Sequence, residues 1–421
     1  MIKPEIIRKD FPSGFKAQVI RRKGFNQRFF GIIVDFGSAD PQPVPGLAHF
    51  LEHKLFAAEE GDLSLEFEKI GASVNAFTSF NETMYYASGV KNVGPMIDLL
   101  FKLVGQPYFT DENVAKEIPI IQQELAMYQD EPDWILGDRL LRGIYGDCNL
   151  AIDVAGTRES IASVTKEKLQ AAYDENYVAA RMSFVACGDF TDNQVKTILR
   201  QARKLSDQYL RPGKPQKEAD LVPFLPSGQD WNLIGGEVPL FTAAIPLPNF
   251  KKVLASRDMS QILLEIMLES KLGAASHWFA SARQAGLVSQ PLQISVTYTR
   301  QGAYAVLLGM SPEAEELLDQ IKAELAPDKL FPKKQEMEMR KLFEIHKRSW
   351  LAQTVRSLDN LSGFAVEMAE ESLDEEDLFA NVEQMQAMNF ADYRAYCQEL
   401  CEGASINTAR LLEEDDQWSE H

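Results

Sequence analysis

The sequence predicts an α+β protein made of two related halves, and three observations support this prediction. Runs rich in β-branched and aromatic residues cluster between helical stretches, an order typical of helices packed on one face of a mainly antiparallel sheet. Residues 211–228, near the midpoint of the 421-residue chain, are rich in Pro, Gly and charged residues, as linkers are. The segments before and after this linker repeat the same order of elements.

The repeat is visible when the elements of each half are taken in order. In the first half we predict a strand at 30–36, a helix at 45–58, and a small-residue segment with strands at 71–90. In the second half we predict a strand at 240–246, a helix at 257–271, and a small-residue segment with strands at 285–310. Further helices complete each half. The predicted domains are therefore 1–210 and 229–421, joined by the linker at 211–228.

The most specific signal in the chain is the run His-Phe-Leu-Glu-His at 49–53. On a helix, at about 100° per residue, His49 and His53 lie one turn apart on one face, with Glu52 beside them. Two neutral imidazoles can hold Zn²⁺ while an unligated carboxylate takes a proton from water. The pattern therefore indicates a hydrolytic zinc site, with Glu52 as the general base.

The rest of this helix supports the same interpretation. Leu47, Leu51 and Leu55 repeat every four residues on the opposite side, where they can anchor the helix to a core. The alternative is a surface helix that carries two unrelated histidines. We disfavour it because a third ligand is available further along the chain.

The expected third ligand is Glu124, in the stretch 111–128. Glu117 lies seven residues earlier, two helical turns away, so the two carboxylates share one stripe of the predicted helix. One of them can bind zinc while the other orients a ligand or the substrate. Without the upstream motif, two such glutamates would be interpreted as a solvated helix face.

The helix that carries them shows both a start signal and a complication. Thr110 or Asp111 can cap it. An apolar face is formed by Val114, Ile118, Ile121, Leu125 and Tyr128. Pro119 removes a backbone hydrogen bond and clashes with the preceding turn. We therefore expect either a kink at Pro119 or a helix that starts later than its cap suggests.

Together these residues resemble the zinc peptidases of the pitrilysin, insulin-degrading-enzyme and mitochondrial-processing-peptidase family, called inverzincins. In that family the motif is followed, about 70 or more residues on, by two glutamates seven apart, of which the later binds zinc. The resemblance is strong over about residues 25–190. It implies zinc ligation by His49, His53 and Glu124, general-base action by Glu52, and an orienting role beside the metal for Glu117.

The resemblance also implies a fold and a substrate site. In relatives, two related α+β halves enclose a cleft, and the stretch 70–87 resembles the family's segment between the ligands. The positions that match Asn75, Ala76, Phe77 and Thr78 belong in relatives to a strand edge that borders the zinc. The expected substrate is an extended peptide that adds to this edge as a further strand.

The second half departs from the family pattern. It has no His in the helix predicted at 257–271, so only one half can hold metal. Many active relatives carry an Arg and, seven residues later, a Tyr that reach the substrate across the cleft. The matching positions here are Ala282 and Ser289; Arg283 is one residue off, and Tyr298 or Tyr304 could substitute.

A partner chain would supply the missing groups. We expect a homodimer, or a heterodimer with a homologue that lacks the zinc motif. Bacterial family members with the run His-Phe-Leu-Glu-His-Lys-Leu-Phe, which is present here, are often encoded beside such a homologue.

Composition excludes several classes of partner. The net charge is −19, and residues 351–421 alone hold 17 acidic and three basic residues, so nucleic acid is not an expected partner. We interpret this acidic region as a source of solubility, with attraction of basic peptides as the alternative. Apolar runs stay below the length of about 18 residues that spans a membrane. The N-terminus does not resemble a signal peptide and the four Cys are sparse, which favours a cytoplasmic location.

Two functions remain in consideration. The first is a zinc-dependent metalloendopeptidase that hydrolyses extended peptides. The alternative is a peptide-binding or scaffold subunit of a heterodimeric peptide-processing complex, with little activity alone. The intact Glu52 favours the first, because a structural zinc site needs no general base.

Overall fold

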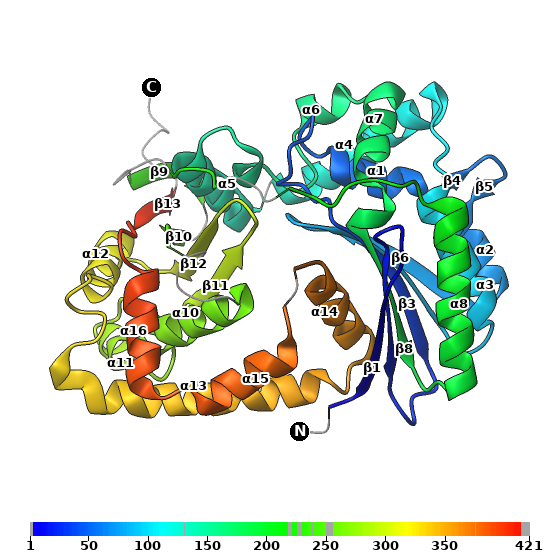
Figure 1. Cartoon of the computed structure of the whole chain (residues 1–421). Coiled ribbons are helices and arrows are strands. Elements are labelled where there is room, and N and C mark those ends of the chain that lie inside the picture. Colours follow the sequence, from blue (N-terminus) through cyan, green and yellow to red (C-terminus); the bar gives the residue numbers. More distant parts are fainter. Residues whose placement is uncertain are drawn as a thin grey trace, which may run out of the picture. The chain divides into compact units, whose positions relative to one another are not determined.

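The computed structural model describes residues 3–129, 131–217, 221–224, 230–236, 240–249, 256–374 and 376–413. It divides into two compact units, each with its own sheet (Figure 1). The first unit comprises Met1–Ala126, Asp153–Glu218 and Gln353–Phe379. The second unit comprises Met127–Ile152, Ala219–Ala352 and Ala380–His421.

These units differ from the predicted domains 1–210 and 229–421 in two segments. Residues 127–152 belong to the second unit and residues 353–379 to the first. Each segment carries a helix whose apolar side packs against the sheet of the unit that it joins. The predicted linker 211–228 lies only partly within the described residues, and its described start belongs to the first unit, where Arg211 forms a bridge with Val178.

The first unit contains a six-stranded sheet in the order β1-β2-β8-β3-β7-β6. Its strands are β1 (Glu5–Asp10), β2 (Lys16–Arg21), β3 (Arg28–Val34), β6 (Ala72–Thr78), β7 (Thr83–Gly89) and β8 (Met182–Gly188). Neighbouring strands are antiparallel except β2 and β8, which are parallel. A separate two-stranded ribbon is formed by β4 (Ala57–Ala58) and β5 (Gly61–Asp62).

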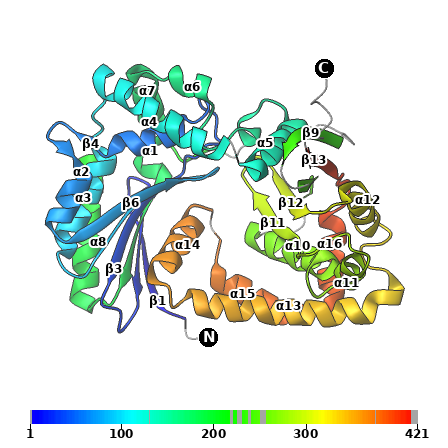
Figure 2. The ribbon, with the colours of Figure 1, turned by 180° about the vertical axis from the view of Figure 1, so that it is seen from behind.

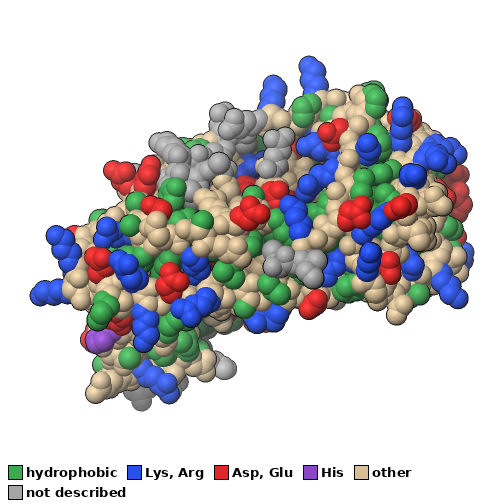
Figure 3. Space-filling model, turned by 60° about the horizontal axis from the view of Figure 1, so that its bottom comes forward, with side chains coloured by type: hydrophobic (Ala, Val, Ile, Leu, Met, Phe, Trp, Pro, Cys, Tyr) green, Lys and Arg blue, Asp and Glu red, His purple; other side chains and the backbone are tan. Residues whose placement is uncertain are grey.

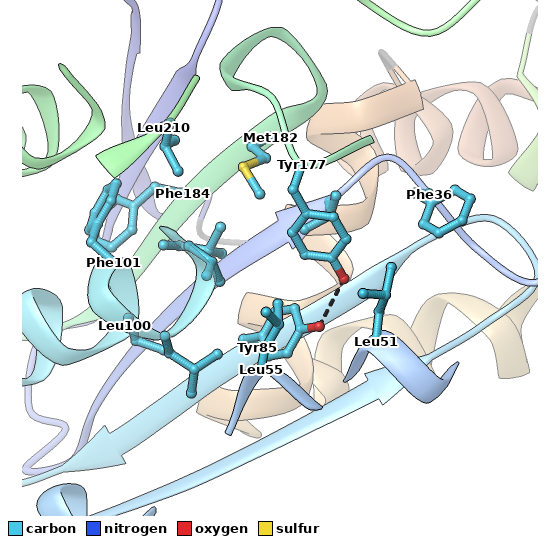
Figure 4. Close-up of a cluster of buried hydrophobic side chains, with 14 of the residues drawn as sticks. Phe36, Leu51, Leu55, Tyr85, Leu100, Phe101, Tyr177, Met182, Phe184 and Leu210 are labelled. Carbon is cyan, nitrogen blue, oxygen red and sulfur yellow. Dashed lines mark hydrogen bonds between the residues drawn. The ribbon is translucent and has the colours of Figure 1, made fainter. Parts of the chain in front are cut away.

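Helices from the first half of the chain cover one face of this sheet. They include α1 (Leu47–Leu55), α2 (Leu63–Lys69), α3 (Val93–Gly105), α4 (Asp111–Gln129), α6 (Arg158–Ala162), α7 (Lys166–Asn176) and α8 (Asp192–Tyr209). Their apolar sides share one core with alternate β3 residues such as Phe30 and Ile32. In Figure 4, Leu51 and Leu55 of α1 lie beside Tyr85 and Tyr177, whose buried hydroxyls hydrogen-bond at 2.8 Å.

The opposite face of the same sheet is covered by α14 (Leu361–Asp374), from far along the chain (Figure 2). The other alternate residues of β3, Phe29 and Ile33, pack with Phe364 and Met368 of α14. The prediction of helices on one face therefore holds only for helices close in sequence. The reason is that β3 is apolar on both faces, so both must be covered.

The second unit contains a five-stranded sheet in the order β11-β12-β10-β13-β9. Its strands are β9 (Asp230–Gly236), β10 (Leu240–Pro246), β11 (Gln293–Tyr298), β12 (Ala303–Met310) and β13 (Asn407–Glu413). The pair β13 and β9 is parallel and the other pairs are antiparallel. This order repeats β6-β7-β3-β8-β2 of the first unit strand for strand, including the place of the parallel pair, so the predicted internal repeat is confirmed.

Helices of the second unit pack around this sheet. They include α5 (Pro132–Tyr145), α10 (Arg257–Leu272), α11 (His277–Gln284), α12 (Ala314–Glu324) and α16 (Phe390–Leu400), together with most of α13 (Glu336–Ser357) and of α15 (Leu378–Ala387). The helix α5, from the first half of the chain, contacts β9, β10 and β13. The fold is therefore α+β in both units, as predicted.

Charged side chains are distributed more evenly than the sequence suggested. On the face drawn in Figure 3, basic and acidic side chains are interspersed. The acid-rich stretch 351–421 is divided between the units: residues 353–379 belong to the first unit and residues 380–413 to the second. Within the described part of the chain, no helix is both long enough and apolar enough to cross a membrane.

Candidate metal centre

Two structural features favour glycine at the start of helix α1. Gly46 has a φ of 83°, and a Cβ at this position would come within 2.4 Å of the carbonyl oxygen of Ala155. The Gln42 side chain substitutes for a capping residue, because its Oε1 accepts a hydrogen bond from the N–H of Ala48 at 3.0 Å. These contacts fix where α1 starts and therefore where His49 lies.

The two histidines lie one turn apart on α1, with ring centroids separated by 4.6 Å. On the opposite side, Leu47, Leu51 and Leu55 are fully buried, as predicted. Burial of one leucine side chain stabilises the fold by about 1.5–3 kcal/mol, so three of them hold the helix firmly in place. His49 and His53 consequently project from a rigid element.

The helix α4 is capped where the sequence predicted. Thr110 and Asn113 bond reciprocally: Thr110 Oγ1 accepts from the Asn113 N–H at 3.1 Å, and Asn113 Oδ1 accepts from the Thr110 N–H at 3.0 Å. The helix then runs through Pro119 without ending, so the alternative of a later start is wrong. Pro119 is tolerated because it lies on the exposed side of α4, as does Ala115, whose carbonyl it leaves without a helical partner.

The apolar face of α4 is mostly as predicted. Val114, Ile121 and Leu125 are buried, and Ile118 packs partly buried beside them. Tyr128, however, is 51% exposed. The prediction failed there because the first unit ends at Ala126, so the last turn of α4 has left its core.

The structure brings the three predicted ligands together. The Nε2 atom of His49 lies 3.8 Å from Glu124 Oε1, and Nε2 of His53 lies 3.6 Å from Glu124 Oε2. One ligand atom from each of the three residues lies within 4.8 Å of the others. Two imidazole nitrogens and one carboxylate form a donor set that catalytic zinc sites use, so these residues fit that ion.

Burial and charge act differently on the two imidazoles. Burial, reinforced by the nearby His53, lowers the pKa of His49 to about 3, so this ring is neutral and able to bind metal. Burial also acts to lower the pKa of His53. The hydrogen bond to Glu117 and the charges of Glu52, Glu117 and Glu124 outweigh it, so the pKa of His53 is raised.

Glu52 is half-buried beside the ligands and makes a different contact. Its Oε2 accepts a hydrogen bond from Thr78 Oγ1 at 2.6 Å. Burial raises the pKa of Glu52, and the bond from Thr78 and the charge of His53 offset part of that effect. Glu52 is not one of the three clustered ligands, so its carboxylate remains available to exchange a proton.

Glu117 lies on the far side of the His53 ring. Its Oε1 is 3.1 Å from His53 Nδ1, and its Oε2 accepts from Lys54 Nζ at 2.9 Å. Burial acts to raise the pKa of Glu117, but the bonds from His53 and Lys54 outweigh it and lower that pKa. Glu117 therefore contacts the His53 ring and is not itself one of the clustered donors.

The predicted substrate segment lies on β6, the last strand of the first sheet. Asn75 Oδ1 accepts from the N–H of Ala76 at 2.9 Å, and Phe77 lies 6.4 Å from the ring of Tyr86 on β7. Thr78, at the end of the strand, reaches Glu52. The segment is therefore a sheet edge that leads to the metal centre.

The structure places the second-unit residues discussed above as follows. Ala282 is buried in α11, while Arg283 and Ser289 are exposed. Tyr304 is buried, and burial raises its pKa to about 12. The Tyr298 hydroxyl donates to Asp258 at 2.6 Å.

Two features of the site were missed by sequence reasoning. Lys54 was not singled out, although its side chain is only 6% exposed and contacts Glu117. Thr78 was predicted to bind substrate, and its bond to Glu52 was not foreseen. The only local signal for Lys54 was a lysine between His53 and the anchoring Leu55.

Comparisons with known families agree with this geometry. Residues 26–158 match the family described as Insulinase (Peptidase family M16). Residues 163–339 match the description Peptidase M16 inactive domain. The first match contains the whole predicted ligand set, and the second covers much of the metal-free half.

Individual proteins are similar over most of the chain. A Bacillus subtilis protein named as an uncharacterized zinc protease, YmfH, is 31% identical over 327 residues, which is 74% of this chain and 76% of that protein. A protein from Alicyclobacillus acidocaldarius described as an M16-like peptidase superposes with a TM-score of 0.85 at 24% identity, covering 98% of this chain and 99% of that one. A Pseudomonas fluorescens structure described as a peptidase M16 inactive domain gives 0.79 at 15% identity, covering 97% of each chain. The two structures show the fold alone.

Proposed function

The chain belongs to the insulinase family of peptidases, family M16, and from that membership we propose that it is a zinc-dependent metalloendopeptidase acting on extended peptides. One observation carries the proposal. His49, His53 and Glu124 converge into a three-donor group, while Glu52 stands beside them outside the ligand set. A site that only held a structural metal would have no use for this fourth group.

The residues divide the chemistry between them. His49, His53 and Glu124 would hold zinc, which when bound supplies a Lewis acid that acidifies water and polarises a peptide carbonyl. Glu52 takes the proton from the attacking water and later delivers it to the leaving amine. Burial raises the pKa of Glu52, which moves this carboxylate toward the range where it can both accept and return a proton.

Thr78 and Glu117 position the groups that react. The Thr78 hydroxyl holds one oxygen of Glu52 by its bond at 2.6 Å, which leaves the other oxygen to face the water. Glu117 holds the His53 ring from behind through Nδ1, so that Nε2 points to the metal side. Both contacts restrict side-chain rotation before substrate binds.

We further propose that substrate binds as an extra strand on β6. This strand is the edge of the first sheet, and its Asn75–Thr78 segment leads to Glu52. Main-chain hydrogen bonds would then provide most of the affinity, with limited dependence on sequence.

A partner chain is the third part of the proposal. Ala282 and Ser289 stand where many active relatives carry an Arg and a Tyr, and Tyr304 is buried in the second unit. A homologue without the zinc motif would supply these groups from the matching positions, and a second copy of this chain would supply them from other positions. If it is needed for turnover, the chain alone is a zinc-binding scaffold subunit with little activity.

The test compares the zinc-loaded wild type with Glu52→Gln and Glu265→Gln on a mixed library of quenched peptides. Glu265 is a suitable control because it is also partly buried, with its pKa raised by burial, but lies on α10 of the second unit. Loss of a general base slows turnover by about 10²–10⁴-fold. We expect that loss in Glu52→Gln alone, with equal zinc in all three proteins.

Two outcomes would change the proposal. The scaffold function would be favoured if all three proteins bind stoichiometric zinc and none of them cleaves peptide, even after a homologue without the zinc motif is added. Cleavage by Glu52→Gln at the wild-type rate would rule out the assigned general base.

A further inference from the structure

We propose that Lys54 is a positioning residue of the metal centre, which acts through Glu117 to hold the His53 ring in the orientation that binds zinc. The inference rests on the proposed zinc site. It concerns a residue that contacts neither metal nor substrate. Three observations carry it: the burial of Lys54, the contacts of the two Glu117 oxygens with two different residues, and the contrast between the two histidines.

Lys54 is buried to an unusual degree for a lysine. Its side chain is 6% exposed, and its Nζ donates to Glu117 Oε2 at 2.9 Å. Lysines are almost never buried unless they are paired, because removing an ammonium group from water is costly. A surface lysine at this position would avoid that cost, so the burial indicates a function for the ion pair.

Glu117 uses its two oxygens for two different residues. Oε2 accepts from Lys54 at 2.9 Å, and Oε1 lies 3.1 Å from His53 Nδ1. A carboxylate held at one oxygen by a buried ammonium cannot rotate freely, so its other oxygen has a fixed place. The Nδ1–H of His53 donates to that oxygen, which leaves the Nε2 lone pair for the metal.

The His49 ring is held by packing, without a hydrogen bond at Nδ1 within the described part of the chain. Its Nδ1 is buried and has no hydrogen-bond partner among the described residues, so its ring is held by packing. The His53 side chain is 24% exposed, against 11% for His49, and so has less packing to hold it. The ring with less packing is the one that donates a hydrogen bond to Glu117.

The charge of Lys54 and its positioning role would change zinc affinity in opposite directions. Lys54 carries a positive charge near a site for a divalent cation, so its removal would tighten zinc binding if charge were its main influence. If positioning dominates, its removal weakens zinc binding instead. The sign of the change therefore separates the two interpretations.

The experiment measures zinc affinity of the full-length chain by competition with a chelator, without any peptide substrate. Changing the outer partners of a metal ligand typically costs 10–100-fold in affinity. We expect Lys54→Met to weaken zinc binding by about tenfold, and Lys54→Arg, which keeps charge and hydrogen bond, to restore it to within about threefold of wild type.

A double variant tests whether Lys54 acts through Glu117. Glu117→Gln alone should weaken zinc binding. Adding Lys54→Met to it should have little further effect, because the Glu117 carboxylate through which Lys54 acts is already absent. The cobalt-substituted proteins provide an independent readout: the visible absorption band of Lys54→Met should differ from that of wild type.

Lys271→Met is the matched control. Lys271 is also buried, with a side chain 3% exposed and an ion pair to Glu324 at 2.8 Å, but it lies in the second unit. It should lower thermal stability and leave zinc affinity and the cobalt spectrum unchanged. A general effect of losing a buried ion pair would appear in both variants.

The outcomes distinguish this inference from the proposed function. Wild-type zinc affinity or tighter binding in Lys54→Met would overturn the positioning role and leave the zinc site intact. Equal losses with and without Glu117→Gln would also overturn it. If wild type itself binds no zinc, the proposed function and this inference fail together. Should Lys54→Met not fold, unchanged zinc affinity in Glu117→Gln would refute the inference.

Discussion

The helices α1 and α10 occupy matching places in the two units, yet only α1 carries the means to bind a metal. Each follows a central strand, β3 or β10, and precedes an edge strand, β6 or β11. Each has a partly buried glutamate, Glu52 or Glu265, whose pKa is raised by burial. The residues of α10, however, include no histidine.

The comparison shows that a partly buried carboxylate on this helix is not sufficient for a metal site. Glu265 accepts a hydrogen bond from Gln261 of its own helix at 3.0 Å and another from the backbone of Val296 on the edge strand β11. Glu52 is likewise bonded from an edge strand, by the Thr78 hydroxyl of β6. Two imidazoles and a glutamate from α4 complete the first unit's cluster. Among its described residues, the second unit keeps the fold of the repeat without such a cluster.

The largest effect should come from removing the ligand that α4 provides. Glu124→Gln replaces a charged ligand with a weak neutral one, so zinc affinity should fall more than about 100-fold, and peptidase activity with it. Chelator competition and metal analysis measure the change. Glu112→Gln on the same helix is the control, because that exposed residue pairs with the exposed Lys116 at 2.7 Å and lies outside the cluster of three donors. Retention of full zinc by Glu124→Gln would show that the third ligand lies elsewhere.

A smaller effect is expected from the edge-strand side chain that bonds to Glu52. Thr78→Val keeps the side-chain shape but removes the hydroxyl that donates to Glu52 at 2.6 Å. Because a hydrogen bond to a charged group contributes about 1.5–3 kcal/mol, kcat/KM should fall by about tenfold or more, with zinc content unchanged. Thr78→Ser should retain most of the rate. Normal kinetics in Thr78→Val would mean that Glu52 needs no such support.

The smallest effect concerns stability in the second unit. Burial raises the pKa of Glu265 above its ordinary value of 4.5. The folded state therefore holds the proton longer than the unfolded state, and wild type loses stability as the pH rises from the unfolded pKa to the folded one. Glu265→Gln removes this loss.

The expected gain for Glu265→Gln is a rise in Tm of a few degrees at most at pH 7, which shrinks toward zero below about pH 4.5. Thermal unfolding at both pH values measures it. A variant that is less stable than wild type at pH 7 would show that the bond from Gln261 matters more than the buried charge.

Local sequence patterns predicted the parts of the site that depend on one helix. The spacing of His49 and His53 gave the ligand face of α1, and the leucines on its other side are buried as expected. The reciprocal bonds of Thr110 and Asn113 mark the start of α4, which the sequence also indicated. Helical periodicity is a short-range property, so it can be read without knowing what the helix contacts.

Contacts between distant segments could not be predicted in this way. Lys54 is buried because Glu117 lies opposite it, 63 residues further along the chain, whereas lysines elsewhere are usually solvated. Likewise, α14 packs on β3 and β8, more than 170 residues earlier in the chain, and the local sequence of α14 does not indicate this contact. The same limit explains why a single predicted boundary at 211–228 did not show that residues 127–152 belong to the second unit and residues 353–379 to the first.

The central claim is that one unit holds a zinc ion with Glu52 free beside it. Anomalous scattering at the zinc edge, from crystals of the full chain grown with zinc, tests it most directly. The account predicts one strong peak bonded to His49, His53 and Glu124, with Glu52 and Glu117 outside bonding distance. A peak in the second unit, or a peak with Glu52 as a direct ligand, would contradict it.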